Sequence, residues 1–95
     1  MKVRNMTSER TGREVANQFI IEHDGQIYFQ SYKTIIAKID EKRRVILDHN
    51  AEYYSKTTSK YLYTFLANYA PTVASREQAK QDIKNGCFWR MNLNA

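Results

Sequence analysis

Three groups of residues in this chain carry side chains that could take part in chemistry. A polar cluster with Asp48, His49 and Glu52 follows an apolar run, and a single cysteine, Cys87, lies near the end of the sequence. The third group consists of basic side chains that alternate with aromatic ones. Carboxylates and imidazoles can bind metals or exchange protons, a thiolate can attack an electrophile, and basic groups bind anions.

The polar cluster gives little indication of an enzyme. The spacing of Asp48, His49 and Glu52 matches no known metal-ligand pattern, and a loop at a strand end is usually polar. His23 stands apart beside Asp24, where a turn is expected, so we interpret it as a solvated turn residue. An enzyme built on these groups is kept only as a third hypothesis.

Cys87 has no base next to it in the sequence. It lies between Gly86 and Phe88 at the start of an apolar segment, so we expect a small buried hydrophobic residue. One cysteine excludes an internal disulfide and a zinc site built from several cysteines. We therefore expect no catalytic residue, no metal and no cofactor.

Basic and aromatic residues are the remaining signal. They form a turn patch, a pair at the expected start of the first helix, a stripe spaced by four along the second helix, and an aromatic–basic pair near the end of the chain. Basic groups follow phosphates, and exposed rings stack on bases, although a solvated helix face would also explain the stripe. The candidates for binding a macromolecule are Lys42, Arg43, Arg44, Lys56, Lys60, Arg76, Lys80, Lys84, Trp89 and Arg90.

The overall charge agrees with a binding role. The formal net charge is +5, which favours polyanionic partners or acidic protein surfaces, although mild basicity can also serve solubility alone. Apolar residues make up 42% of the chain, enough for one core in one domain spanning residues 1–95. No apolar run indicates a signal peptide or a membrane span, so we expect a cytoplasmic protein.

The elements that position these residues begin with strands. Residues 1–14 are polar and mixed in charge, and we expect a loosely held arm. Residues 15–48 contain four short β-rich runs separated by turns, which predict an antiparallel β-meander.

Two registers are open for the first hairpin, around "HDG". A two-residue Asp-Gly turn pairs Ile21 with Tyr28, whereas a three-residue loop pairs Ile21 with Ile27 and Phe19 with Phe29. We prefer the second register because it places four apolar side chains on one face.

The chain then changes to a helical period. An apolar stripe precedes Pro71, and Ser75 with Gln78 forms a capping pattern before a second helix that ends at Asn85-Gly86. We expect both helices within residues 55–86, packed on one sheet face, and a short strand in residues 87–93. That strand could be an edge strand or a tail across the sheet, and Phe88 and Trp89 would point to opposite faces of it. The predicted fold class is α+β.

The start of the first helix, "YYSKTTSK", needs a separate explanation. Ser55, Thr57 and Thr58 compete to be the N-cap, which accounts for one or two hydroxyls. It does not account for Lys56 and Lys60, because a helix start already carries partial positive charge and favours anions.

This composite of strands and helix start resembles a family of small proteins carried by bacteriophages and other mobile elements, whose function is uncharacterised. The resemblance covers roughly residues 15–69 and implies no catalytic residues. The shared positions are Phe29, Ser31, Tyr32, Thr34, Ile36-Ala37 and Tyr54 through Lys60.

Two binding functions follow as hypotheses. The first is a non-enzymatic inhibitor of a nucleic-acid-handling defence machine of the bacterial host, such as a CRISPR effector, a role suggested by the resemblance. The alternative is a small basic DNA- or RNA-binding accessory or regulatory protein. The expected partner is therefore a host protein complex or a nucleic acid, with no membrane involved. A homodimer through the Phe88–Trp89 segment or a free sheet edge is compatible with either role.

Overall fold

The computed structural model describes all 95 residues, and a six-stranded sheet forms its centre. The spatial order follows the chain; β1 to β5 are antiparallel to their neighbours, and β6 joins parallel to β5. The predicted α+β class is confirmed, and the predicted four-stranded meander is the β2–β5 part of this larger sheet. The strands are β1 (Lys2–Thr7), β2 (Glu14–His23), β3 (Gln26–Ser31), β4 (Thr34–Ile39), β5 (Val45–Asp48) and β6 (Trp89–Met91).

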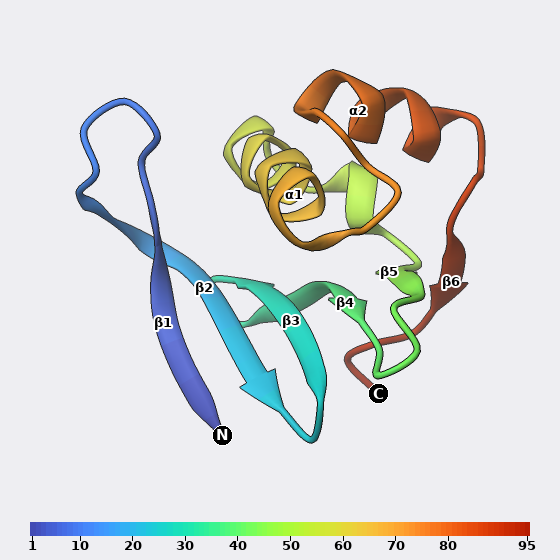
Figure 1. Cartoon of the computed structure of the whole chain (residues 1–95), viewed down its shortest axis with the longest axis horizontal. Helices are drawn as coiled ribbons and strands as arrows, with labels where there is room; N and C mark the ends of the chain where they lie inside the picture. Colours follow the sequence, from blue (N-terminus) through green and yellow to red (C-terminus); the bar gives the residue numbers. More distant parts are fainter.

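The helical elements lie between β5 and β6 in the chain. They are a short 3-10 helix, η1 (Ala51–Tyr53), followed by α1 (Lys56–Tyr69) and α2 (Arg76–Lys84). Figure 1 shows α1 and α2 on the same side of the sheet, with no helix on the other side. Neither helix is both long and apolar enough to cross a lipid bilayer.

The N-terminal segment differs from the prediction. It is not a loose arm, because Lys2–Thr7 forms strand β1 and pairs with β2 along its length. Only Met6 of this strand is buried, so the sequence shows no apolar alternation there. The edge of the ten-residue β2 supplies the backbone partners that hold a polar segment in place.

The register preferred for the first hairpin is also wrong. His23 pairs with Gln26 and Ile21 pairs with Tyr28, so Asp24 and Gly25 alone form the turn. Both turn residues have positive φ, 51° and 75°, as a two-residue hairpin turn of the twisted type requires. The favourable turn geometry of Asp-Gly therefore outweighs the apolar match that the longer loop offers.

The helix boundaries follow local signals that the sequence contained. Ser55 caps α1 by accepting a hydrogen bond from the backbone N–H of Thr58, and α1 ends at Tyr69, shortly before Pro71. Ser75 caps α2 by accepting from the backbone N–H of Gln78. At the other end, Gly86 takes a φ of 70° and closes the helix in a Schellman arrangement.

The core lies between the helix-facing side of the sheet and α1. The rings of Phe29 and Phe65 stack with centroids 5.7 Å apart. The buried Thr58 hydroxyl lies 2.9 Å from the Ser31 hydroxyl of β3 and so ties the start of α1 to the sheet. The fully buried apolar side chains of this layer include Phe29, Ile36, Ala37, Leu47, Leu62, Phe65 and Leu66.

The opposite side of the sheet has its own set of side chains. Residues paired across neighbouring strands share a face, so the register identifies the side chains that point away from the helices. They form what we call the uncovered face: Val3, Asn5, Phe19, Ile21, Tyr28, Gln30, Ile35, Lys38, Ile46 and Trp89.

The C-terminal segment forms a shorter strand than predicted and exposes its cysteine. Only Trp89–Met91 pairs with β5, and the strand lies at the sheet edge. Phe88 is half-buried against the core, whereas Trp89 is 68% exposed. Cys87 is exposed and not buried as expected, because it follows the left-handed Gly86 that turns the chain away from α2.

Candidate functional site

A groove between α1 and α2 gathers most of the basic candidates from the two helices. Its volume is about 620 Å³, and it is open to solvent. Basic, aromatic and acidic side chains share its walls. The lining residues are Glu52, Tyr54, Lys56, Ser59, Lys60, Tyr63, Arg76, Glu77 and Lys80.

Helical spacing explains why these side chains meet. Lys56, Lys60 and Tyr63 are separated by four and three residues, so they project from one face of α1. Arg76 and Lys80 are separated by four and project from one face of α2. The structure therefore brings two separately predicted basic patches into one groove.

The lysines of the groove have no acidic partner. Lys56, Lys60 and Lys80 take part in none of the ion pairs of the structure. The ammonium of Lys60 lies 5.4 Å from the centre of the Tyr61 ring. These three charges are available to an anion without first breaking a salt bridge.

Arg76 is only loosely engaged. Its guanidinium lies 3.7 Å from the carboxylate of Glu9, and both side chains are about half exposed. A solvent-exposed pair of this kind contributes little to stability and exchanges readily for another anion.

The first residue of each helix lines this groove. Lys56 is the first residue of α1 and Arg76 the first of α2, and both line the walls. The unpaired backbone N–H groups of a helix start carry partial positive charge. The first turn of α1 contains no acidic residue, so nothing on that helix offsets the charge of its first lysine.

A second hollow continues the groove toward the β1–β2 connection. It has a volume of about 270 Å³ and shares Lys60 and Arg76 with the first. It adds Arg10 from the loop that follows β1, together with Glu9. The two hollows form a basic path from Tyr54 to Arg10, which we call the basic groove.

The other basic candidates lie elsewhere. Lys84, one turn beyond Lys80, is exposed and does not line the groove. Arg43 and Arg44 lie beside Trp89 in a separate hollow at the β4–β5 turn, and Lys42 belongs to the same turn. The Arg44 side chain is held by Asp40 at 2.8 Å, and the hydrogen bonds from Arg44 keep the pKa of that carboxyl below its ordinary value.

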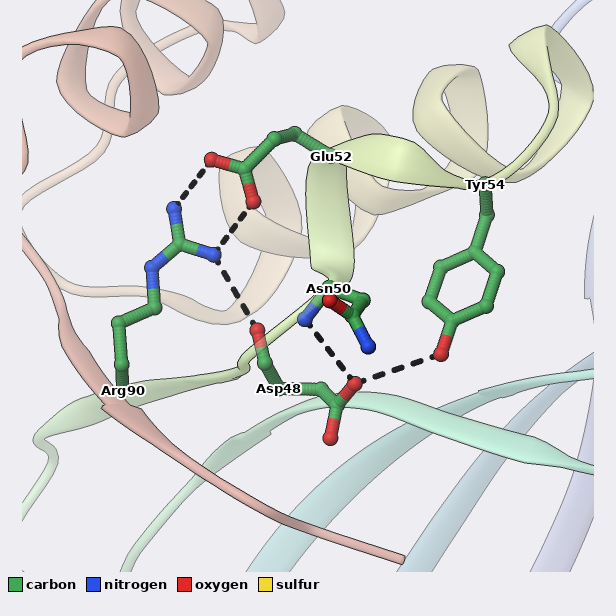
Figure 2. Close-up of polar contacts among 5 residues, drawn as sticks. All are labelled: Asp48, Asn50, Glu52, Tyr54 and Arg90. Atoms are coloured by element: carbon green, nitrogen blue, oxygen red, sulfur yellow. Dashed lines mark hydrogen bonds and ion pairs between the residues drawn. The ribbon is translucent and has the colours of Figure 1, made fainter.

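The polar cluster after β5 has a structural explanation. Figure 2 shows the Arg90 guanidinium donating to both carboxylate oxygens of Glu52, and one of its nitrogens also donating to the backbone carbonyl of Asp48. The hydrogen bonds from Arg90 hold the pKa of Glu52 below its ordinary value. Arg90 therefore joins β6 to the chain after β5, and we leave it out of the proposed site.

Asp48 fixes the C-terminal tail. Its carboxylate accepts hydrogen bonds from the backbone N–H of Leu93 at 3.0 Å and the side chain of Asn94 at 3.2 Å, as well as from Asn50 and Tyr54. Burial opposes the charge, but these hydrogen bonds outweigh it and hold the pKa of Asp48 below its ordinary value. Burial and the charge of Asp48 raise the pKa of Tyr54.

The histidines are not brought together. His23 lies at the β2–β3 turn, and His49 follows β5 at the opposite end of the sheet. No three histidine, cysteine or acidic residues are gathered closely enough to hold a metal ion.

Sequence reasoning missed Tyr63 and Arg10 as groove residues. Tyr63 lies outside the apolar stripe of α1 and at a helical spacing from Lys56 and Lys60, a signal that was present in the sequence. Arg10 had no such signal, because its position depends on the pairing of β1 with β2.

Comparison with known proteins gives family membership without an activity. The chain belongs to a family described as "Family of unknown function (DUF8033)", which matches residues 1–85. The search of curated proteins and the search of solved structures found no match. The expected relationship to an uncharacterised family is confirmed, and the match extends beyond the predicted residues 15–69 to include β1 and α2.

Proposed function

We propose that this chain is a non-enzymatic binding protein whose basic groove holds the phosphate backbone of a single-stranded nucleic acid. The observation that carries the proposal is the convergence of four basic side chains and two tyrosines on the groove between α1 and α2; all come from the two helices except Tyr54, which lies just before α1. Of the roles expected from the sequence, this geometry favours the DNA- or RNA-binding accessory protein.

The charges of the groove suit a chain of phosphates. Lys56, Lys60 and Lys80 are unpaired, and a bound phosphate would also offset the positive end of α1, whose first turn has no acidic residue. Cations that neutralise phosphates release condensed counterions, which drives binding at low salt. This explains why lysines stand where a helix start alone would disfavour them.

The tyrosines favour a single strand over a duplex. Tyr54 is 37% exposed and Tyr63 is half-buried, and both line the groove walls. Bases that are free of a duplex can stack on such rings, with a gain of about 1–3 kcal/mol per base. A rigid duplex would present only its backbone to them.

Fluorescence anisotropy with labelled oligonucleotides tests the proposal. At low salt, wild-type protein is expected to bind a single strand of about 12 nucleotides more tightly than a duplex of the same length. Failure of the folded protein to bind DNA or RNA single strands at about 50 mM salt would overturn the proposal.

A mixed charge pattern favours a second candidate, inhibition of a nucleic-acid-handling defence machine of a bacterial host. Glu77 shares the groove with the basic residues and has no basic partner, a pattern that also suits a protein surface with both charges. An origin in a phage or mobile element belongs to this candidate. Affinity capture from host lysate with and without nuclease separates the two, because nuclease-resistant recovery of one protein complex favours inhibition and nuclease-sensitive recovery favours nucleic acid.

A further inference from the structure

The uncovered face of the sheet has the composition of an interface and not that of a solvated surface. Phe19, Ile21 and Tyr28 lie at its centre, and all three are half-buried. At its edges, Val3 is 57% exposed and Trp89 is 68% exposed. A sheet face on which most side chains are apolar normally packs against another layer.

From this face and its lack of charge, we infer that two copies of the chain associate with their uncovered faces packed against each other. Of the residues that define the face, Lys38 alone is charged, and its ammonium lies 5.8 Å from the centre of the Tyr28 ring. Asp48, which alternation along β5 places on the same side, is buried and bonded to Leu93 and Asn94 of the C-terminal tail. An acidic protein or a nucleic acid would need several cations there. A partner surface for this face is therefore neutral and apolar. The uncovered face of a second copy of the chain is such a surface.

The net charge also favours packing of two copies through their uncovered faces. Each copy carries a formal net charge of +5, so two copies repel each other across most of their surfaces. Contact through the uncovered face keeps the basic grooves apart, because α1 and α2 lie on the opposite side of the sheet (Figure 1). The dimer would carry one groove on each outer side.

The size of the face is adequate for a specific interface. Six strands spaced by about 4.8 Å, with about six residues of about 3.3 Å each, give a projected area on the order of 500 Å². Two such faces bury on the order of 1,000 Å² in all, which is about the lower limit for a specific interface. Two sheets packed in this way lie about 10 Å apart, as in a β-sandwich.

Trp89 is the only tryptophan of the chain and reports directly on this contact. Sedimentation of the full chain from micromolar to millimolar concentration is expected to show a rise from 11.2 kDa to twice that mass. The Trp89 emission should shift to the blue over the same concentration range, because the ring leaves water. A chain that stays at 11.2 kDa throughout overturns the inference.

Two variants locate the interface, and a third serves as the control. Ile21→Lys at the centre and Trp89→Lys at the edge should each weaken the dimer by roughly 100-fold, since each places a charge in the contact. Trp89→Lys is the safer variant because its side chain is mostly exposed in the single copy. Gln81→Lys adds the same charge on exposed α2 and should leave the dimer intact.

The remaining outcomes also decide the question. A dimer that survives both Ile21→Lys and Trp89→Lys uses another surface and overturns the inference. A chain that stays monomeric, but whose Trp89 emission shifts on addition of phosphatidylcholine vesicles, assigns the face to lipid instead. Nucleic-acid binding by the monomeric variants is measured separately, so a failure here leaves the groove proposal standing.

Discussion

The two sides of this sheet differ in the kind of partner they can attract. On the helix side, the basic groove presents lysines without acidic partners and two tyrosines. On the other side, the uncovered face presents apolar side chains with one lysine. A charged groove binds through long-range attraction that salt screens, whereas an apolar face binds through contact and burial.

A chain of 95 residues has room for both proposed binding surfaces. The core lies between the sheet and α1, so the outer faces of the helices and the far side of the sheet are left for other roles. Because the two surfaces lie on opposite sides, a change to one should not affect the other.

The largest expected effect comes from removing the unpaired charges of the groove. The triple variant Lys56→Ala, Lys60→Ala and Lys80→Ala should weaken binding of a single-stranded oligonucleotide by roughly 100-fold at low salt. Fluorescence anisotropy measures the affinity, and circular dichroism checks that the fold is intact.

A control variant has the same net charge as the groove variant. Lys2→Ala, Lys33→Ala and Lys42→Ala also removes three exposed lysines, none of which lines the groove. It should lose far less affinity than the groove variant. Equal losses would mean that binding depends on net charge alone and that the groove has no special role.

Loss of one aromatic wall should have a smaller effect. Tyr63→Ala removes one ring from the groove, and we expect the affinity for a single strand to fall by roughly 5- to 10-fold. The salt dependence should not change, because no charge is removed. A similar loss of affinity for duplex DNA would argue against base stacking.

Removal of the Asp48 carboxylate, which holds the C-terminal tail, should lower the stability of the fold and affect the two surfaces unequally. Asp48→Ala leaves the backbone N–H groups of Leu93 and Asn50 without their acceptor, at a cost of about 1–3 kcal/mol in the free energy of unfolding. Because the tail follows β6, dimerisation should weaken more than nucleic-acid binding does at temperatures below the melting transition. Urea denaturation and sedimentation measure the two effects, and an unchanged stability would contradict this role of Asp48.

The lowered pKa values of Asp48 and Glu52 predict that the stability of the fold depends on pH. The native pKa values of Asp48 and Glu52 lie below their ordinary values, so both carboxylates stabilise the fold above about pH 5. This stability is lost as the pH falls from about 5 through the lowered native values. Thermal unfolding between neutral and acidic pH should show a steeper decline for wild type than for Asp48→Asn.

The smallest expected effect is the most direct check on independence. Trp89→Lys should leave the affinity of the basic groove for an oligonucleotide within about twofold of wild type, because β6 does not line it. Titration to saturation should give one oligonucleotide per chain in both proteins. A large loss of affinity would show that the two surfaces are coupled.

The parts of the fold that were predicted from the sequence depend on local signals. Ser55, Ser75 and Gly86 mark helix ends through their own hydrogen bonds and backbone angles, so both helices were placed correctly. The first hairpin shows the limit of apolar matching, because the turn formed by Asp24 and Gly25 set the register.

The parts that were missed depend on contacts between distant segments. Strand β1 forms because β2 offers it an edge, and the sequence of a polar strand does not show this. The basic groove likewise required the packing of α1 against α2, which no periodicity within one helix contains. The sequence supplied the lysines of the site, and tertiary structure brought them together.

The salt dependence of oligonucleotide binding tests the central claim most directly. With the four basic side chains that lie between α1 and α2 and about 0.7 counterions released per contact, the plot of log affinity against log salt should have a slope of about −3. The groove variant Lys56→Ala, Lys60→Ala and Lys80→Ala should reduce that slope by about 2. A wild-type slope near zero, or a slope that the variant leaves unchanged, would contradict the account.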